Sequence, residues 1–228
     1  MDILRVHSRC GWSNSRHNQR SLIIYITIEG NIGAGKTTIL KELAEELGFE
    51  YQPEGVESDS EFQRLVKSIG DGELNAGERL NAYLAKKRVD TIKGFDPAKD
   101  YVMERSVTSA MLFAMADGSS DETLDKIYRH IVATPQPYLS IYLRTPAPEC
   151  MKRIKKRNRS GEQTLPMKYL RKVEKTHDEW AEVGEEVHRV LVIDDGEMSV
   201  GQMAELVKVK LEVVKNYGTL YELKEGGC

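Results

Sequence analysis

The sequence predicts a single α/β domain built on a doubly wound, parallel sheet of five strands. Two observations support this prediction. Short, β-branched apolar runs alternate along the chain with segments of helical periodicity, and a loop with three glycines joins the first run to the first helix. Strands that alternate with helices pair in parallel, because each crossover helix returns the chain to the starting edge of the sheet. A chain of 228 residues can give one such domain a substantial core.

The first strand is the clearest element, because LIIYITIE over Leu22–Glu29 is too rich in β-branched residues for a helix. The first helix, Thr37–Leu47, ends at Gly48, a residue type that favours helix C-termini. The strands are expected over residues 22–29, 49–52, 101–104, 138–143 and 190–193. The helices are expected over residues 37–47, 58–69, 78–92, 107–116, 122–133, 148–157, 166–183 and 200–214. We also expect a basic tail over residues 1–20, one domain over 21–217 with a lid at about 153–165, and a loose tail over 218–228.

Composition and charge narrow the class of protein. Hydrophobic residues make up 40% and charged residues 30%, the net charge is -3, and no apolar run is long enough to span a membrane. We therefore expect neither nucleic acid nor a membrane as partner. Cys10, Cys150 and Cys228 form no CxxC pair, which argues against zinc and fits a reduced, cytoplasmic location. A mitochondrial transit peptide is the alternative, because the N-terminus holds four arginines: Arg5, Arg9, Arg16 and Arg20.

The glycine loop predicts a binding site for a nucleoside triphosphate. Gly30–Thr37, GNIGAGKT, fits the pattern G-x-x-x-x-G-K-[ST] and lies between a strand and a helix, as that motif requires. Backbone N–H groups of such a loop point at phosphate oxygens, the lysine reaches the β- and γ-phosphates, and the threonine hydroxyl ligates Mg²⁺. The residues expected to bind ATP are Asn31, Ile32, Gly33, Ala34, Gly35, Lys36, Thr37 and Thr38. The guanine-binding pattern [NT]-K-x-D of a GTPase is missing from the sequence.

With this loop, three further motifs resemble the deoxynucleoside kinase family, which includes deoxycytidine, deoxyguanosine and mitochondrial-type thymidine kinases. The motifs are IEGNIGAGKTT at 28–38, PEGV at 53–56, ERSVTSA at 104–110 and CMKRIKKRNRSGEQTLPMKYL at 150–170. The resemblance covers residues 22–195. It implies a P-loop nucleoside and nucleotide kinase fold with a helical lid, ATP with Mg²⁺, a deoxynucleoside acceptor and a homodimer.

The resemblance also implies roles for the residues that match these motifs. Glu54 is expected to accept the proton of the acceptor's 5′-hydroxyl, and Lys36 to hold the donor. Glu104 is expected near Mg²⁺ beside Thr37, and Arg105 near the 5′-oxygen. A carboxylate suits a hydroxyl acceptor because phosphoryl transfer needs that hydroxyl held in line with the γ-phosphate.

Six cations lie within the eight residues Lys152–Arg159. Arg153 and Arg157 fall at i and i+4 and therefore share one helical face, which suits a lid over phosphates. The resemblance assigns Arg153, Arg157 and Arg159 to the lid and Glu162 to the sugar 3′-hydroxyl, with Arg157 also catalytic. A nucleic-acid patch is the alternative, but aromatic residues for base stacking are missing beside it.

The base preference depends on a second group of residues. Asn81 and Arg88 correspond to base-contacting positions of the family, and their spacing of seven residues places both on one helical face. Ala110 leaves room for a thymine methyl group, and Phe113 is expected to stack on the base. These residues favour thymidine or another deoxypyrimidine as acceptor.

Two other functions stay open at this point. The first is a thymidylate kinase, because the segment between Glu54 and Glu104 is short and Arg88 suits a phosphate acceptor. The second is a nucleotide-binding switch without catalysis.

Asp194 and Asp195, after the last strand, are expected to border the adenine.

Overall fold

The computed structural model describes residues 24–158, 165–186 and 189–225. The described strands form one parallel sheet in the order β2-β3-β1-β4-β5, so the predicted fold class is confirmed. The strands are β1 (Tyr25–Gly30), β2 (Glu50–Gln52), β3 (Tyr101–Glu104), β4 (Leu139–Arg144) and β5 (Val190–Asp194). The helices are α2 (Lys36–Leu47), α3 (Ser60–Gly70), α4 (Ala76–Lys93), α5 (Val107–Asp117), α6 (Asp121–Val132), α7 (Ala147–Arg157), α8 (Met167–Glu186) and α9 (Val200–Glu225).

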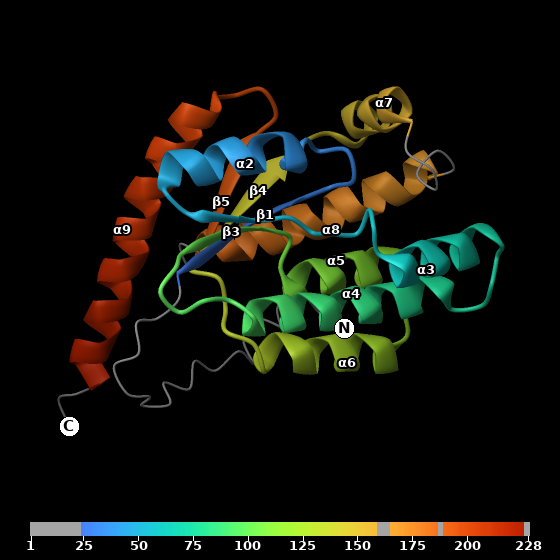
Figure 1. Ribbon diagram of the computed structural model, residues 1–228, viewed down its shortest axis with the longest axis horizontal. Helices are drawn as coiled ribbons and strands as arrows, with labels where there is room; N and C mark the ends of the chain where they lie inside the picture. The colour runs from blue at the N-terminus through green and yellow to red at the C-terminus, as the bar shows by residue number, and fades with distance from the viewer. Residues whose placement is uncertain (1–23, 159–164, 187–188, 226–228) are drawn as a thin grey trace.

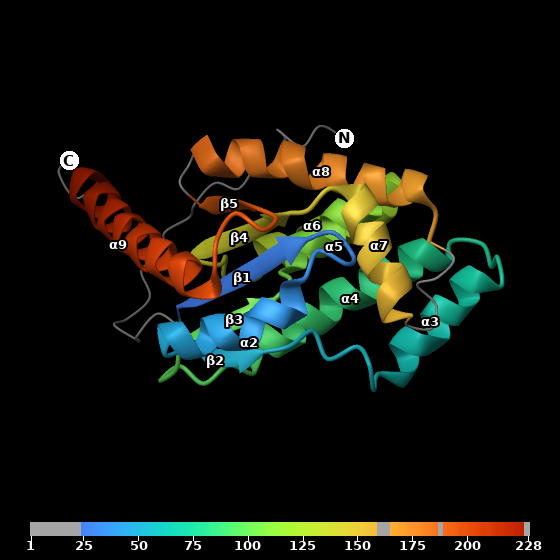
Figure 2. The same ribbon diagram turned by 90° about the horizontal axis from the view of Figure 1, so that it is seen from above.

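Helices cover both faces of the sheet. Figure 1 shows α2 on one side and α5, α4 and α6 stacked on the other, and Figure 2 shows α8 running along the β4 and β5 side. Strand β1 lies at the centre and every one of its residues is buried, which explains its nearly continuous apolar sequence. Its neighbours are in register, with Ile26 opposite both Val102 and Leu139.

The parallel arrangement brings the loops that follow β1, β2, β3 and β5 to one edge of the sheet. In open α/β sheets this carboxyl edge is where ligands bind. Helix α5 begins at the same edge, because the side chain of Ser106 accepts a hydrogen bond from the Ser109 backbone N–H and so caps its first turn. Helix α3 begins in the same way, with Asp59 accepting from the Phe62 N–H.

The prediction of a loose tail from Gly218 is wrong for most of that segment, because α9 continues to Glu225. The reason is that a single glycine costs a helix only about 1 kcal/mol, and no proline follows it. None of the helices in the described ranges is long and apolar enough to cross a membrane.

Candidate active site

The glycine loop has a backbone that only glycine allows at two positions. Gly30 has φ 143°, and a Cβ there would lie 2.8 Å from the Leu143 carbonyl oxygen. Gly33 has φ 82°, and its Cβ would lie 2.7 Å from the Cys150 carbonyl oxygen. The loop ends at Gly35, which precedes α2 without a side-chain cap, so the N–H groups of the first helical turn are available to an anion.

Lys36 lies folded into this loop. Its Nζ donates to the carbonyl oxygens of Asn31, at 2.8 Å, and Gly30, at 3.4 Å. Burial, and next the nearby charge of Arg105, lower the pKa of Lys36 to about 7. A triphosphate placed in the loop would supply the negative charge that favours the protonated form.

Other residues of the loop are tied to the helices around it. Asn31 donates through Nδ2 to the Leu170 carbonyl oxygen at 2.8 Å, which joins the loop to α8. The Ala34 carbonyl oxygen accepts from Thr145 Oγ1 and from Arg153 Nη1, each at 3.2 Å. The side chain of Asn31 thus supports the loop. Ile32, Ala34 and Thr38 remain predicted contacts of ATP, because of their positions in and beside the loop.

Glu54 lies between two arginines from different elements. Arg88 of α4 pairs with Glu54 Oε1, and Arg105 Nε lies 3.5 Å from Glu54 Oε2. Burial alone would raise the pKa of Glu54, but the charges of Arg88 and Arg105 and the hydrogen bond from Arg88 hold it below its ordinary value. The carboxylate is therefore ionised at neutral pH and able to accept a proton from a hydroxyl group.

Arg105 adopts a left-handed backbone conformation, φ 64°, which is strained for a residue other than glycine. Its Nη1 donates to the Gly30 carbonyl oxygen at 2.9 Å and to Ser109 Oγ at 3.2 Å. Its guanidinium also lies 4.6 Å from the centroid of the Phe113 ring. These contacts hold one cation between Glu54, the glycine loop and α5.

Thr37 and Glu104 supply oxygen atoms suited to a divalent cation. Thr37 Oγ1 lies 3.2 Å from each carboxylate oxygen of Glu104. Hydroxyl and carboxylate oxygens are the ligands that Mg²⁺ prefers, and Mg²⁺ typically uses one or two carboxylates together with phosphates of the substrate. Among the described residues, no three or more His, Cys, Asp or Glu side chains gather where they could hold a metal ion.

The predicted base-contacting residues lie on facing helices. Asn81 and Arg88 are both buried on one face of α4, and Ala110 and Phe113 lie on α5, which packs against α4. Asn81 donates through Nδ2 to Asp117 Oδ2 at 2.8 Å. The four predicted residues thus lie on two helices that pack against each other, and the contact of Asn81 adds the carboxylate of Asp117 to them.

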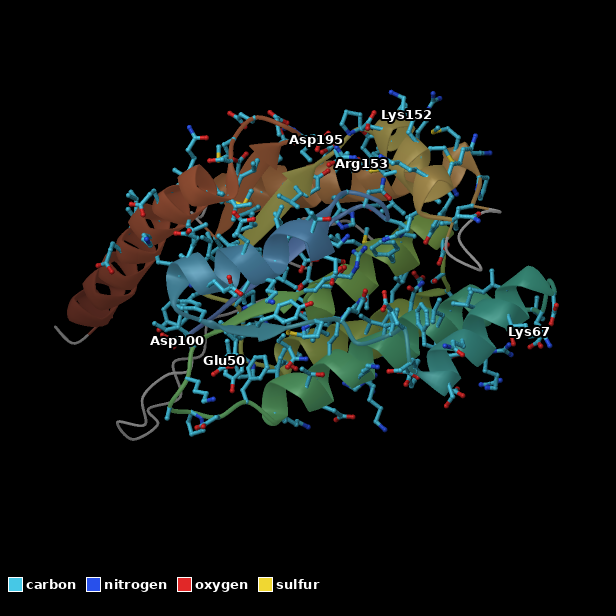
Figure 3. The ribbon with its side chains drawn as sticks, turned by 45° about the horizontal axis from the view of Figure 1, so that its top comes forward. Glu50, Lys67, Asp100, Lys152, Arg153 and Asp195 are labelled. Atoms are coloured by element: carbon cyan, nitrogen blue, oxygen red, sulfur yellow. The ribbon has the colours of Figure 1, made fainter. Side chains whose placement is uncertain are left out.

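The lid arginines lie at the other end of the site. Figure 3 shows Arg153 beside Asp195, and Arg153 Nη2 donates to both carboxylate oxygens of Asp195, at 2.7 and 2.9 Å. Arg157 lies one turn further along α7. Asp194 instead pairs with Arg144, at 2.5 and 2.8 Å. Arg159 and Glu162 lie outside the described residues, so their predicted roles remain predictions.

Sequence reasoning missed several residues of this site. Glu29 is fully buried at the end of β1, and its Oε1 accepts the Ser106 backbone N–H at 2.6 Å. Tyr169 of α8 hydrogen-bonds to Asp117. For Glu29, the available signal was an acidic residue at the end of an apolar strand. Tyr169 lies within the motif at 150–170, which indicated no role for it, and no sequence pattern indicated Asp117.

The parallel sheet, the glycine loop at its carboxyl edge and the carboxylate held between two arginines define a P-loop kinase. Comparison with known proteins then gives the family: the deoxynucleoside kinase profile matches residues 26–216. The chain belongs to the deoxynucleoside kinase family, as its motifs predicted, and is a kinase.

Several relatives show how broad this similarity is. The chain is 36% identical over 155 residues to a deoxyadenosine kinase of Lactobacillus acidophilus, covering 62% of this chain and 70% of that protein. It is 28% identical over 187 residues to human mitochondrial thymidine kinase 2, covering 75% and 69%. It is 29% identical over 201 residues to a probable thymidylate kinase of Pyrococcus abyssi, covering 82% and 97%. A deoxyadenosine kinase structure from M. mycoides shares the fold, with a TM-score of 0.67 at 24% identity over 83% of this chain and all of that one.

Proposed function

We propose that the protein transfers the γ-phosphate of ATP to the 5′-hydroxyl of a deoxynucleoside, a reaction of nucleotide salvage. The observation behind this proposal is the partly buried carboxylate of Glu54, ionised and held by Arg88 and Arg105 beside the glycine loop. Phosphoryl transfer needs an acceptor in line with the phosphate, together with positive charge around the transferred group.

We propose a role for each of these residues, supported by where it lies around the glycine loop. The glycine loop and Lys36 hold the triphosphate, and Glu54 accepts the 5′-hydroxyl proton as the oxygen attacks. Arg105 orients the acceptor, while Arg153 and Arg157, on one face of α7, offset negative charge on the donor. Mg²⁺, held by Thr37 and Glu104 with the phosphates of ATP, would neutralise charge that develops on the phosphate oxygens.

The small residue at position 110 supports a deoxypyrimidine as one acceptor. Ala110 is buried, with 1% of its surface exposed, and it brings a single methyl group to the face of α5 that meets α4. A larger side chain would fill the space that a 5-methyl group needs. Thymidine and deoxycytidine are therefore both proposed as acceptors.

We also propose that the protein forms a homodimer and lies in the cytoplasm, with mitochondria as the alternative location.

One observation favours a second function, thymidylate kinase. Arg88 Nε and Nη1 are buried and have no hydrogen-bond partner among the described residues. Two arginines beside one another can bind a phosphate group of a monophosphate acceptor. The carboxylate of Glu54 favours the hydroxyl acceptor, because it would repel that phosphate.

A coupled ADP assay with thymidine, thymidylate and the other deoxynucleosides tests the proposal. We expect turnover with deoxynucleosides and none with thymidylate; phosphorylation of thymidylate alone would overturn the proposal. Glu54→Gln should lose turnover while it still binds ATP, which separates a kinase from a nucleotide-binding switch. Glu50→Gln is the matched control, because Glu50 pairs with Lys99 at the surface and Figure 3 shows it far from Arg153 and Asp195.

A further inference from the structure

We propose that Asp117 contacts the base of the acceptor and selects deoxynucleosides whose base has an exocyclic amino group, such as deoxycytidine and deoxyadenosine. The proposal rests on the function proposed above and names its substrate class more narrowly. It assigns a role to a residue at the end of α5 that no motif of the sequence indicated.

The position of Asp117 follows from the two facing helices. Asn81 and Arg88 lie seven residues apart on α4, which is two helical turns or about 10 Å. Arg88 marks the end of the site where Glu54 would receive the 5′-hydroxyl. Asn81 marks the opposite end, and there it contacts Asp117. A nucleoside with its 5′-oxygen at Glu54 therefore extends its base toward Asn81 and Asp117.

Residues of α5 also follow the direction from the 5′-oxygen toward the base. Ala110, Phe113 and Asp117 recur at intervals of three and four residues, so they lie on one face of the helix. Phe113 lies under the Arg105 guanidinium, and Asp117 lies one turn beyond Phe113. Ala110 leaves space for the ring of the base, Phe113 offers it an aromatic surface, and Asp117 meets its far edge.

The hydrogen bonds determine what this edge can accept. An ionised carboxylate has only acceptors, so the side-chain atom of Asn81 that contacts Asp117 must be the amide nitrogen. Tyr169 donates its hydroxyl hydrogen to the same carboxylate. Two donors leave lone pairs of the carboxylate unused. Asp117 is exposed to solvent when the whole residue is considered, and its carboxyl group contacts Asn81 and Tyr169.

Those lone pairs distinguish amino groups from carbonyl groups. The N4 amino group of cytosine or the N6 amino group of adenine would donate a hydrogen bond to Asp117. A carbonyl oxygen at the same position, as in uracil, thymine or hypoxanthine, would face the carboxylate oxygens and be repelled, so thymidine would be the poorer of the two pyrimidine acceptors proposed above. Hydrogen bonds to charged groups contribute about 1.5–3 kcal/mol, which corresponds to a preference of about 10- to 100-fold.

The experiment compares acceptors that differ only in this group. We expect kcat/KM to be about 10- to 100-fold higher for deoxycytidine than for deoxyuridine, and for deoxyadenosine than for deoxyinosine. In Asp117→Asn, which keeps the shape and adds a donor, both ratios should fall toward one. Asp125→Asn is the control, because Asp125 pairs with Arg129 on the exposed side of α6.

Each other outcome would overturn the proposal. Ratios near one in the wild type would show that the base edge is not selected, and unchanged ratios in Asp117→Asn would show that another residue selects it. An equal loss for all four acceptors would make Asp117 structural. Binding of ADP confirms that the variant is folded, and Asp117→Ser replaces it if that binding is lost. Failure of the proposed function itself is distinct, since then none of the four deoxynucleosides is phosphorylated.

Discussion

Arg88, which is buried, and Glu54, which is partly buried, form an ion pair that joins α4 to the loop after β2. Only 5% of the Arg88 side chain and 17% of the Glu54 side chain are exposed. A buried pair of this kind contributes little net stability, because both charges lose their hydration. Its main effect is on position: it holds the carboxylate at the edge of the glycine loop and leaves two nitrogens of Arg88, Nε and Nη1, for a substrate.

Replacing Arg88 by methionine should therefore affect both stability and pH dependence. Removing one partner leaves a partly buried carboxylate facing Arg105 and, more weakly, Lys36, at a cost of up to about 3–5 kcal/mol in the free energy of unfolding. Arg88 lowers the pKa of Glu54, so that pKa should rise in the variant, and the acid limb of kcat/KM should move to higher pH. Denaturation curves and pH–rate profiles measure the two effects. An unchanged acid limb would contradict the role of Glu54 as base.

Lys87 should act on the same carboxylate through the backbone. Its Nζ donates to the Gly55 carbonyl oxygen at 2.9 Å and pairs with Asp59. Lys87→Met frees the residue that follows Glu54, and a small displacement of a catalytic group can cost about 100-fold in rate. We expect kcat to fall by about 10- to 100-fold with little change in the KM for ATP. Lys86→Met, at an exposed neighbouring position, should leave kcat unchanged.

ATP binding should be coupled to proton uptake by Lys36. The pKa of Lys36 is about 7 in the free protein, so at pH 8 the amine is mostly neutral, and the negative triphosphate should restore its proton. Calorimetry in buffers with different ionisation enthalpies measures the uptake, which should approach one proton per site. In Lys36→Arg the uptake should vanish, since a guanidinium keeps its proton. Equal uptake by both proteins would refute the assignment.

The same lowered pKa sets a pH dependence of stability. Between pH 7 and the ordinary lysine range, the unfolded chain binds more protons at Lys36 than the folded protein does. The contribution of this group to the free energy of unfolding therefore rises with pH across that window. Urea denaturation at pH 7 and pH 9 measures it, and Lys36→Met should weaken the dependence.

Two glycine substitutions separate the geometry of the loop from helix propensity. Gly33→Ala should abolish ATP binding, because its Cβ would lie 2.7 Å from a backbone carbonyl oxygen of α7 at a positive φ. Gly201→Ala, in α9 with open space around it, should be neutral or raise stability by up to about 1 kcal/mol. Equilibrium binding of ATP and thermal unfolding measure these outcomes. Wild-type ATP affinity in Gly33→Ala would contradict the inference that the loop has no space for a Cβ at position 33.

Much of the fold was predictable because its signals are local. β-branched runs, helical periodicity and the Gly-Lys-Thr turn each depend on neighbouring residues, so the strands and the glycine loop lie where the sequence placed them. The end of α9 was not predictable in this way. A glycine such as Gly218 ends a helix only when continuing the helix past it lowers the free energy very little. Helix α9 continues through Gly218 to Glu225.

The residues of the site also fall into two groups, those that the sequence indicates and those that only tertiary packing brings together. By itself the sequence determined the glycine loop, the Glu-Arg-Ser turn and the fact that Asn81 and Arg88 share one face of a helix. Only the tertiary structure decided which residues they meet: Glu54 for Arg88, and Asp117 for Asn81. Helical periodicity shows which side of a helix is buried, but the packing of α4 against α5 and the loop after β2 decides which side chain lies opposite.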